Sequence, residues 1–73
     1  MGKMGRVRLK IRELAEEKGW TLQDVAERSG VNYNTLKGYA RRDDGMSMVD
    51  LSAVQKIALA FDVMIEDLVE FLE

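Results

Sequence analysis

Apolar and polar residues between Trp20 and Arg42 recur with the spacing of two short amphipathic helices. Thr21 followed by Asp24 has the form of a capping box, so the first helix is expected to begin directly after Thr21. Gly30 takes a left-handed conformation without steric cost and is expected to end this helix. The pattern therefore predicts a helix over about 22–29.

The second helix of the pair is predicted over about 33–41. Asn32 is a good N-cap for it, and Val31 and Leu36 have the spacing of a hydrophobic staple. Ala26 is small enough to let the two helices cross closely. Together these features predict a helix-turn-helix, with an ordinary helical hairpin in a small bundle as the alternative.

The segment 6–12 alternates strictly between basic and apolar side chains, which is the period of a strand, and helical spacing follows it. One arrangement is a strand over about 6–10 and a helix over about 11–18. Because a lone strand needs a partner, this strand would pair with the tail 69–73, whose acids would face its basic row. The other arrangement has a first helix that begins at the start of the segment and a tail that stays helical. The sequence favours neither.

A polar loop leads from the helix-turn-helix to a further helix, which Asp50 caps and which is expected to run to about Phe61. Met64 stands where the cap of a last helix is expected, and a methionine cannot cap. The inward positions of the Asp50-capped helix are expected to be Leu51, Val54, Ile57, Ala58 and Phe61. The expected fold is all-α, a five-helix domain, with the short N-terminal strand about 6–10 as its variant.

Composition fits one globular helical domain over residues 1–73, since 47% of the residues are hydrophobic, 33% are charged and none is proline. Residues 1–5 are expected to be disordered. The chain has no cysteine and no histidine, which excludes disulfides, thiolate or imidazole metal ligands and histidine-based catalysis. We therefore expect no enzyme, catalytic residue, cofactor, metal or small-molecule ligand; the DDG at 43–45 lacks the other ligands of a calcium loop. The sequence shows no signal peptide or membrane span, and a cytoplasmic location is compatible with it.

Charge is unevenly distributed along the chain, although the net value is −2. Residues 1–42 hold ten of the eleven basic residues and five acids, a net charge of +5. Residues 43–73 hold Lys56 and eight acids, a net charge of −7. Because the helix-turn-helix lies in the basic part, positive potential is expected on its side of the molecule.

The helix-turn-helix stretch resembles the DNA-binding motif of the phage-repressor family, also called Cro/cI or XRE. The residues that carry the resemblance are Thr21, Val25, Ala26, Gly30, Val31, Asn32, Thr35 and Leu36, and Val49–Leu68 resembles the family's later helices. The resemblance covers about 11–72. It implies a phage-repressor-like fold that binds double-stranded DNA in a sequence-specific way.

The residues expected to read bases lie on the exposed face of the helix 33–41, which would enter the major groove. They are Asn32, Tyr33, Asn34, Lys37 and Gly38. Asn34 is the strongest candidate, because an amide can bond the N6 and N7 atoms of adenine together. Asn32 is mainly a cap. The family resemblance implies that DNA approaches closely at Gly38.

The residues expected to bind phosphate are Thr21, Gln23, Thr35, Arg41 and Arg42. Thr21 and Gln23 stand at a helix N-terminus, where free N–H groups and the helix dipole favour an anion. Arg8, Lys10 and Arg12 are expected to extend the basic patch if they face the same side.

The chain departs from the family pattern at two places. Leu22 replaces a glutamine that is usual at the start of the first motif helix, with Gln23 adjacent. Ala15 and Ala40 stand where many members have an arginine and a glutamate that pair with each other. Because both partners are replaced, no lone buried charge is expected.

The expected function is a sequence-specific DNA-binding transcriptional regulator, and a repressor rather than an activator because no separate domain is expected to recruit polymerase. A homodimer is expected for two-fold DNA sites, with Leu59, Val69, Phe71 and Leu72 as candidate contacts. The alternative is an antitoxin that binds a partner protein through its acidic part and autoregulates through the same motif.

Overall fold

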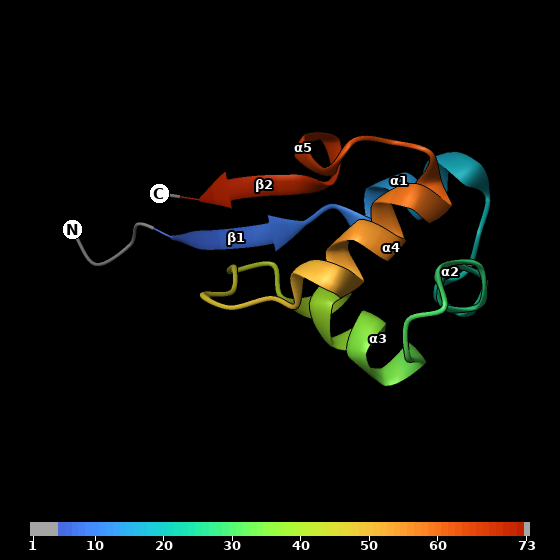
Figure 1. Cartoon of the computed structure of the whole chain (residues 1–73), viewed down its shortest axis with the longest axis horizontal. Coiled ribbons are helices and arrows are strands. Elements are labelled where there is room, and N and C mark those ends of the chain that lie inside the picture. The colour runs from blue at the N-terminus through green and yellow to red at the C-terminus, as the bar shows by residue number, and fades with distance from the viewer. Residues whose placement is uncertain (1–4, 73) are drawn as a thin grey trace.

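The computed structural model describes residues 5–72, which form a mostly helical domain with one short sheet (Figure 1). The elements in chain order are β1 (Arg6–Leu9), α1 (Ile11–Lys18), α2 (Leu22–Ser29), α3 (Tyr33–Arg41), α4 (Leu51–Phe61), α5 (Ile65–Leu68) and β2 (Val69–Leu72). Residues 1–4, for which disorder is expected, lie outside the described part, and Gly5 forms a turn before β1. No helix in the described part is long and apolar enough to cross a membrane.

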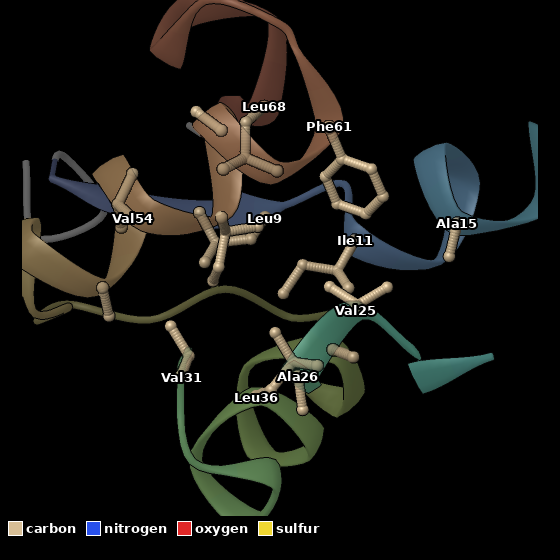
Figure 2. Packing of buried hydrophobic residues seen from close by; sticks show 14 of the residues in the cluster. Leu9, Ile11, Ala15, Val25, Ala26, Val31, Leu36, Val54, Phe61 and Leu68 are labelled. Carbon is tan, nitrogen blue, oxygen red and sulfur yellow. The ribbon is translucent and has the colours of Figure 1, made fainter. Parts of the chain in front are cut away.

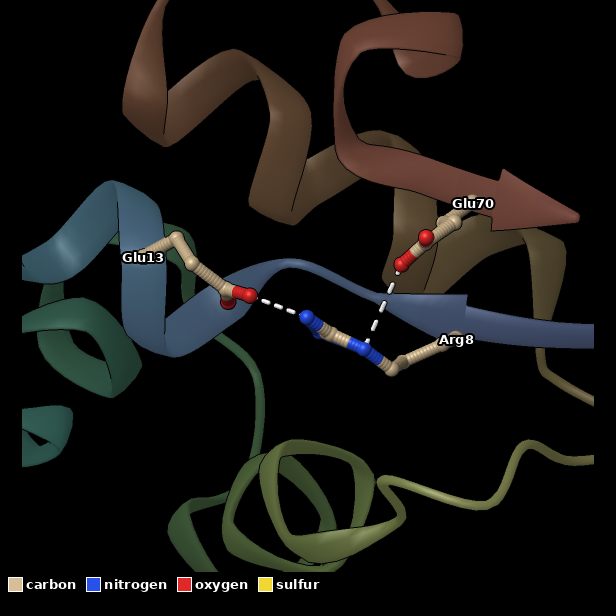
Figure 3. Close-up of polar contacts among 3 residues, drawn as sticks. All are labelled: Arg8, Glu13 and Glu70. Atoms are coloured by element: carbon tan, nitrogen blue, oxygen red, sulfur yellow. Dashed lines mark hydrogen bonds and ion pairs between the residues drawn. The ribbon is translucent and has the colours of Figure 1, made fainter.

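The two ends of the described chain pair as an antiparallel two-stranded sheet, so the arrangement with an N-terminal strand is correct. A first helix that begins at residue 6, a helical tail and a strictly all-α fold are wrong. The register places Arg8 opposite Glu70. Arg8 Nε lies 3.3 Å from Glu70 Oε1, and the same guanidinium pairs with Glu13 of α1 (Figure 3). Arg8 of β1 is thus paired with an acid from the opposite end of the chain, whereas Arg6 pairs with Asp44.

The hydrophobic core draws residues from every helix and from β1 (Figure 2). Its largest fully buried side chains are Phe61, Leu9, Ile11, Leu36, Ile57, Leu68, Val25 and Val54. The Trp20 ring covers one edge of this core and stacks on Phe61 with 5.6 Å between ring centroids. The Arg28 guanidinium lies 4.2 Å from the Trp20 centroid, so α2 is also tied to this aromatic pair.

The inward face of α4 differs at one position from the expected stripe. Val54, Ile57, Ala58 and Phe61 are buried as expected, and Ala53 joins them. Leu51 is 70% exposed, so its expected burial is wrong. It lies at the edge of the apolar stripe in the first turn of α4, beyond the end of the core.

The cap of α5 is incomplete, as expected. The Met64 side chain makes no cap hydrogen bond. Instead, the Asp67 carboxylate accepts a hydrogen bond from the Met64 backbone N–H at 3.3 Å. This single-turn helix therefore begins with only one half of a capping box.

Candidate nucleic-acid interface

Local capping hydrogen bonds fix where α2 begins and ends and where α3 begins. The Thr21 hydroxyl accepts from the Asp24 N–H at 3.1 Å, and the Asp24 carboxylate accepts from the Thr21 N–H at 2.9 Å. Gly30 ends α2 in the left-handed conformation with φ of 76°. Asn32 Oδ1 then accepts from the N–H groups of Asn34 and Thr35 at 2.8 and 3.3 Å. The chain therefore starts α3 almost directly after α2.

One face of α3 is anchored in the protein, which leaves the opposite face to solvent. Leu36 and Ala40 are buried in the core. Tyr39 is half-buried, and its hydroxyl accepts a hydrogen bond from the Asp50 N–H at 3.2 Å, which joins α3 to the start of α4. The exposed residues of α3 are Tyr33, Asn34, Thr35, Lys37, Gly38 and Arg41.

A surface hollow of about 350 Å³ runs beside the exposed face of α3. It is lined by Asn34, Thr35, Gly38, Tyr39, Arg42, Met46, Ser47 and Met48. The hollow thus brings together four of the residues expected to contact DNA. Met46, Ser47 and Met48 come from the loop after α3. No local pattern in the sequence indicates them, because their place depends on how this loop folds back on β1.

An exposed stripe of α3 holds one tyrosine and two basic residues, and neither basic side chain pairs with a carboxylate of the described chain. Tyr33, Lys37 and Arg41 follow each other at intervals of four residues, so their side chains lie along one line of the helix. α3 contains no acidic residue. Like charges at this spacing repel by about 0.2–0.5 kcal/mol, and a nearby polyanion would relieve that repulsion.

The amides of Asn32 and Asn34 are not equivalent. The Asn32 oxygen already accepts two backbone N–H groups, so only its NH₂ group is available to a ligand. The Asn34 side chain makes no hydrogen bond within the described residues and is exposed. Only Asn34 therefore keeps both the donor and the acceptor that a bidentate contact with adenine requires.

Gly38 lies in the interior of α3, and nothing in the described part of the protein requires a glycine at this position. Its φ is not positive, and a Cβ atom at this position would meet nothing within 4 Å. A glycine inside a helix costs about 0.5–1 kcal/mol relative to alanine. Packing within the described chain therefore does not explain Gly38, whereas close approach of an external ligand would.

The start of α2 exposes Thr21 and Gln23. The Leu22 and Gln23 N–H groups have no acceptor in the described chain, so they are available to an anion. Leu22 itself is half-buried and packs against the core, which leaves Gln23 as the amide side chain at this end. The Asp24 carboxylate lies at the same N-terminus and opposes an anion, so this site is weaker than a neutral helix start.

Not all basic residues of the N-terminal part belong to the α3 face. Arg8 pairs with Glu13 and Glu70, and its side chain is mostly buried. Arg6 pairs with Asp44 at 3.6 Å. The expected extension of the patch through Arg8 is therefore wrong, because its charge is used within the fold. Arg12 lies beside Leu22 along another surface hollow, near the start of α2.

Ala15 and Ala40 are both buried in the core. Small apolar side chains thus occupy the two positions at which many members of the phage-repressor family have an ion pair. No charge is left alone in the interior, since the described chain buries no polar or charged residue.

Comparison with known proteins agrees with this geometry. The model of the Cro/C1-type HTH DNA-binding domain family matches residues 10–73. Neither a search of curated proteins nor a search of solved structures found a match. Because the family match spans most of the chain and includes α2 and α3, this chain belongs to the family of Cro/C1-type helix-turn-helix DNA-binding domains.

Proposed function

We propose that this chain is a cytoplasmic, sequence-specific transcriptional regulator that inserts α3 into the major groove of duplex DNA. The observation that carries the proposal is the exposed face of α3, which joins a free amide to unpaired basic side chains and contains no acid. An α-helix fits into the major groove of B-DNA, where each base pair presents its own pattern of hydrogen-bond donors and acceptors. The family match supports DNA binding in general.

The proposed base-reading residues are Asn32, Tyr33, Asn34, Lys37 and Gly38. Asn34 reads adenine, Lys37 reaches guanine or a phosphate, and Tyr33 touches a thymine methyl group or a phosphate. Asn32 contributes through its NH₂ group alone, because its oxygen caps α3.

The proposed phosphate-binding residues are Thr21, Gln23, Thr35, Arg41 and Arg42. Arg42 and Thr35 line the same hollow beside α3, so one DNA strand passing along this hollow would meet both side chains. Thr21 keeps a hydroxyl hydrogen to donate while its oxygen caps α2. These contacts set the position of the protein on the duplex without reading its sequence.

We propose repression because occupancy of a promoter is sufficient for it. Two-fold operators favour a homodimer, with Leu59, Val69, Phe71 and Leu72 as the candidate contacts. Leu59 and Phe71 are exposed, while Val69 and Leu72 are half-buried. No feature of the described residues favours the antitoxin alternative over this function.

Selection of duplexes from a random pool tests the proposed function. We expect enrichment of one motif, with affinity at least about tenfold above that for random duplex and falling steeply as salt concentration rises, because phosphate contacts release counterions. Equal affinity for selected and random duplexes would contradict sequence-specific binding. An affinity that does not change with salt would contradict the phosphate contacts.

The substitution Gly38→Ala is expected to move stability and DNA affinity in opposite directions. Alanine should raise the free energy of unfolding by about 0.5–1 kcal/mol, because its Cβ meets nothing in the protein and alanine is the better helix former. It should weaken binding to the selected duplex, because the Cβ occupies space that the DNA backbone or a base edge needs. Urea denaturation and a mobility-shift titration measure the two effects.

Gln55→Ala is the control for Gly38→Ala, since Gln55 is exposed on α4 outside the proposed interface. Its DNA affinity should be unchanged. If Gly38→Ala binds the selected duplex as well as the parent protein does, close approach at this position is excluded.

A further inference from the structure

The loop between α3 and α4, residues 42–50, is tied to β1 by a pair of backbone hydrogen bonds. The Val7 N–H donates to the Met46 carbonyl at 2.8 Å, and the Met46 N–H donates to the Val7 carbonyl at 2.7 Å. Met46 is buried, with 5% of its surface exposed. Figure 1 shows this loop beside β1. The middle of the loop is therefore held by the N-terminal strand.

The Arg6 side chain makes a second, weaker tie to the same loop. Its Nη2 atom lies 3.6 Å from Asp44 Oδ2 and donates to the Gly45 carbonyl at 3.4 Å. The Asp44 side chain is 81% exposed, so solvent screens this ion pair and its contribution is small. The backbone pair between Val7 and Met46 therefore carries most of the attachment.

Gly45 gives the loop the shape that brings Met46 to β1. Its φ of 94° is one that other residues rarely adopt, and its N–H donates to the Arg42 carbonyl at 3.2 Å. A Cβ atom at this position would lie 2.7 Å from Leu72 Cδ1 of β2. The Leu72 methyl group can rotate away, but the backbone angle cannot be relieved without moving the loop. The fold thus requires a glycine at 45, in contrast to position 38.

The tied segment lies between residues that line the surface hollow beside α3. Arg42 precedes it and Ser47 follows it, and both line the hollow together with Met46 itself. Met46 is thus shared between the hollow and the bridge to β1. One wall of the hollow therefore takes its position from the terminal sheet, not from α3.

We propose that Val7, Arg6 and Gly45 are positioning residues for DNA binding. They hold the loop in the shape in which Arg42 and Ser47 face the DNA strand that passes along the hollow, and they do not touch the DNA themselves. The inference rests on the proposed function, and it gives the two-stranded sheet a part in DNA binding.

The first test is Gly45→Ala in the full chain. We expect the Met46 amide to lose its protection from hydrogen exchange, because the bond to the Val7 carbonyl is disturbed. Affinity for the selected duplex should fall by on the order of tenfold, as for residues coupled through a shared backbone shift. Circular dichroism checks that the helices are retained.

A double-mutant cycle with Arg42→Ala separates positioning from a general loss of stability. In the parent protein, Arg42→Ala should lower the slope of log affinity against log salt concentration by about 1, since one phosphate contact is lost. In the Gly45→Ala protein, the same change should leave the slope almost unaltered, because the displaced loop has already removed that contact.

Val7→Pro is the second variant. It removes the N–H that the Met46 carbonyl accepts, while the ladder with β2 persists, because a residue that gives both backbone groups to Met46 gives none to Phe71 opposite it. Its DNA affinity should fall as in Gly45→Ala. The control is Gln55→Gly, which destabilises α4 at an exposed position away from the loop and should bind the duplex like the parent protein.

Three results would overturn the inference: unchanged DNA affinity in Gly45→Ala or Val7→Pro, a Met46 amide that stays protected in Gly45→Ala, or equal effects of Arg42→Ala in both backgrounds. In each case the parent protein still selects its duplex, so the proposed function stands. A parent protein that selects no duplex would contradict the proposed function and this inference together.

Discussion

Phe61→Ala is expected to lower the free energy of unfolding by about 3–5 kcal/mol. The Phe61 side chain is fully buried at the end of α4 and stacks on Trp20, so its removal leaves a cavity and one unsupported aromatic ring. A domain of this size has a total stability of only about 5–15 kcal/mol. The substitution is therefore expected to remove a large fraction of the total stability and to lower the urea midpoint clearly. Urea denaturation followed by circular dichroism measures the loss.

Leu59→Ala is the control for Phe61→Ala, because Leu59 lies two residues earlier on the same helix and is 71% exposed. Its effect should stay within about 0.5 kcal/mol, as for surface substitutions in general. Equal losses in the two variants would show that α4 packs on the core through a different face.

Asn34→Ala is expected to remove about 1–3 kcal/mol of preference for one base pair of the operator. The reason is that the free amide of Asn34 keeps both a donor and an acceptor for adenine. The backbone N–H of residue 34 still bonds to Asn32, so the fold of α3 should be retained. Titrations against four duplexes, which differ only at the contacted base pair, measure the preference.

Gln55→Ala is again the matched control for Asn34→Ala, since it removes an amide of similar chemistry from an exposed position on α4. It should leave the preference among the four duplexes unchanged. If Asn34→Ala weakens all four duplexes by the same factor, Asn34 contacts the DNA backbone, and the assignment of base reading to it is wrong.

Features that depend on neighbouring residues could be predicted from the sequence. The cap at Thr21, the left-handed turn at Gly30 and the cap at Asn32 each involve residues within four positions of one another. Because a cap and a glycine turn act locally, their chemistry is visible in the order of the residues. These features also set where α2 and α3 begin and where α2 ends.

Features that depend on distant residues could not be decided from the sequence. β1 has the alternation of a strand, but its partner β2 lies at the other end of the chain, so local spacing left a helix equally open. In the sequence, Arg8 is one more positive charge of the basic part. Only the fold shows that it pairs with Glu13 and Glu70. Leu51 fits the apolar stripe of α4, yet periodicity does not show where the core ends.

The central claim, that the exposed face of α3 contacts duplex DNA, is tested most directly by NMR. Backbone amide shifts of the labelled protein are measured while the selected duplex is added. We predict the largest changes at residues 32–42, with smaller ones at residues 21–23. Largest changes in β1, β2 and α5, with the amides of α3 unmoved, would contradict the claim.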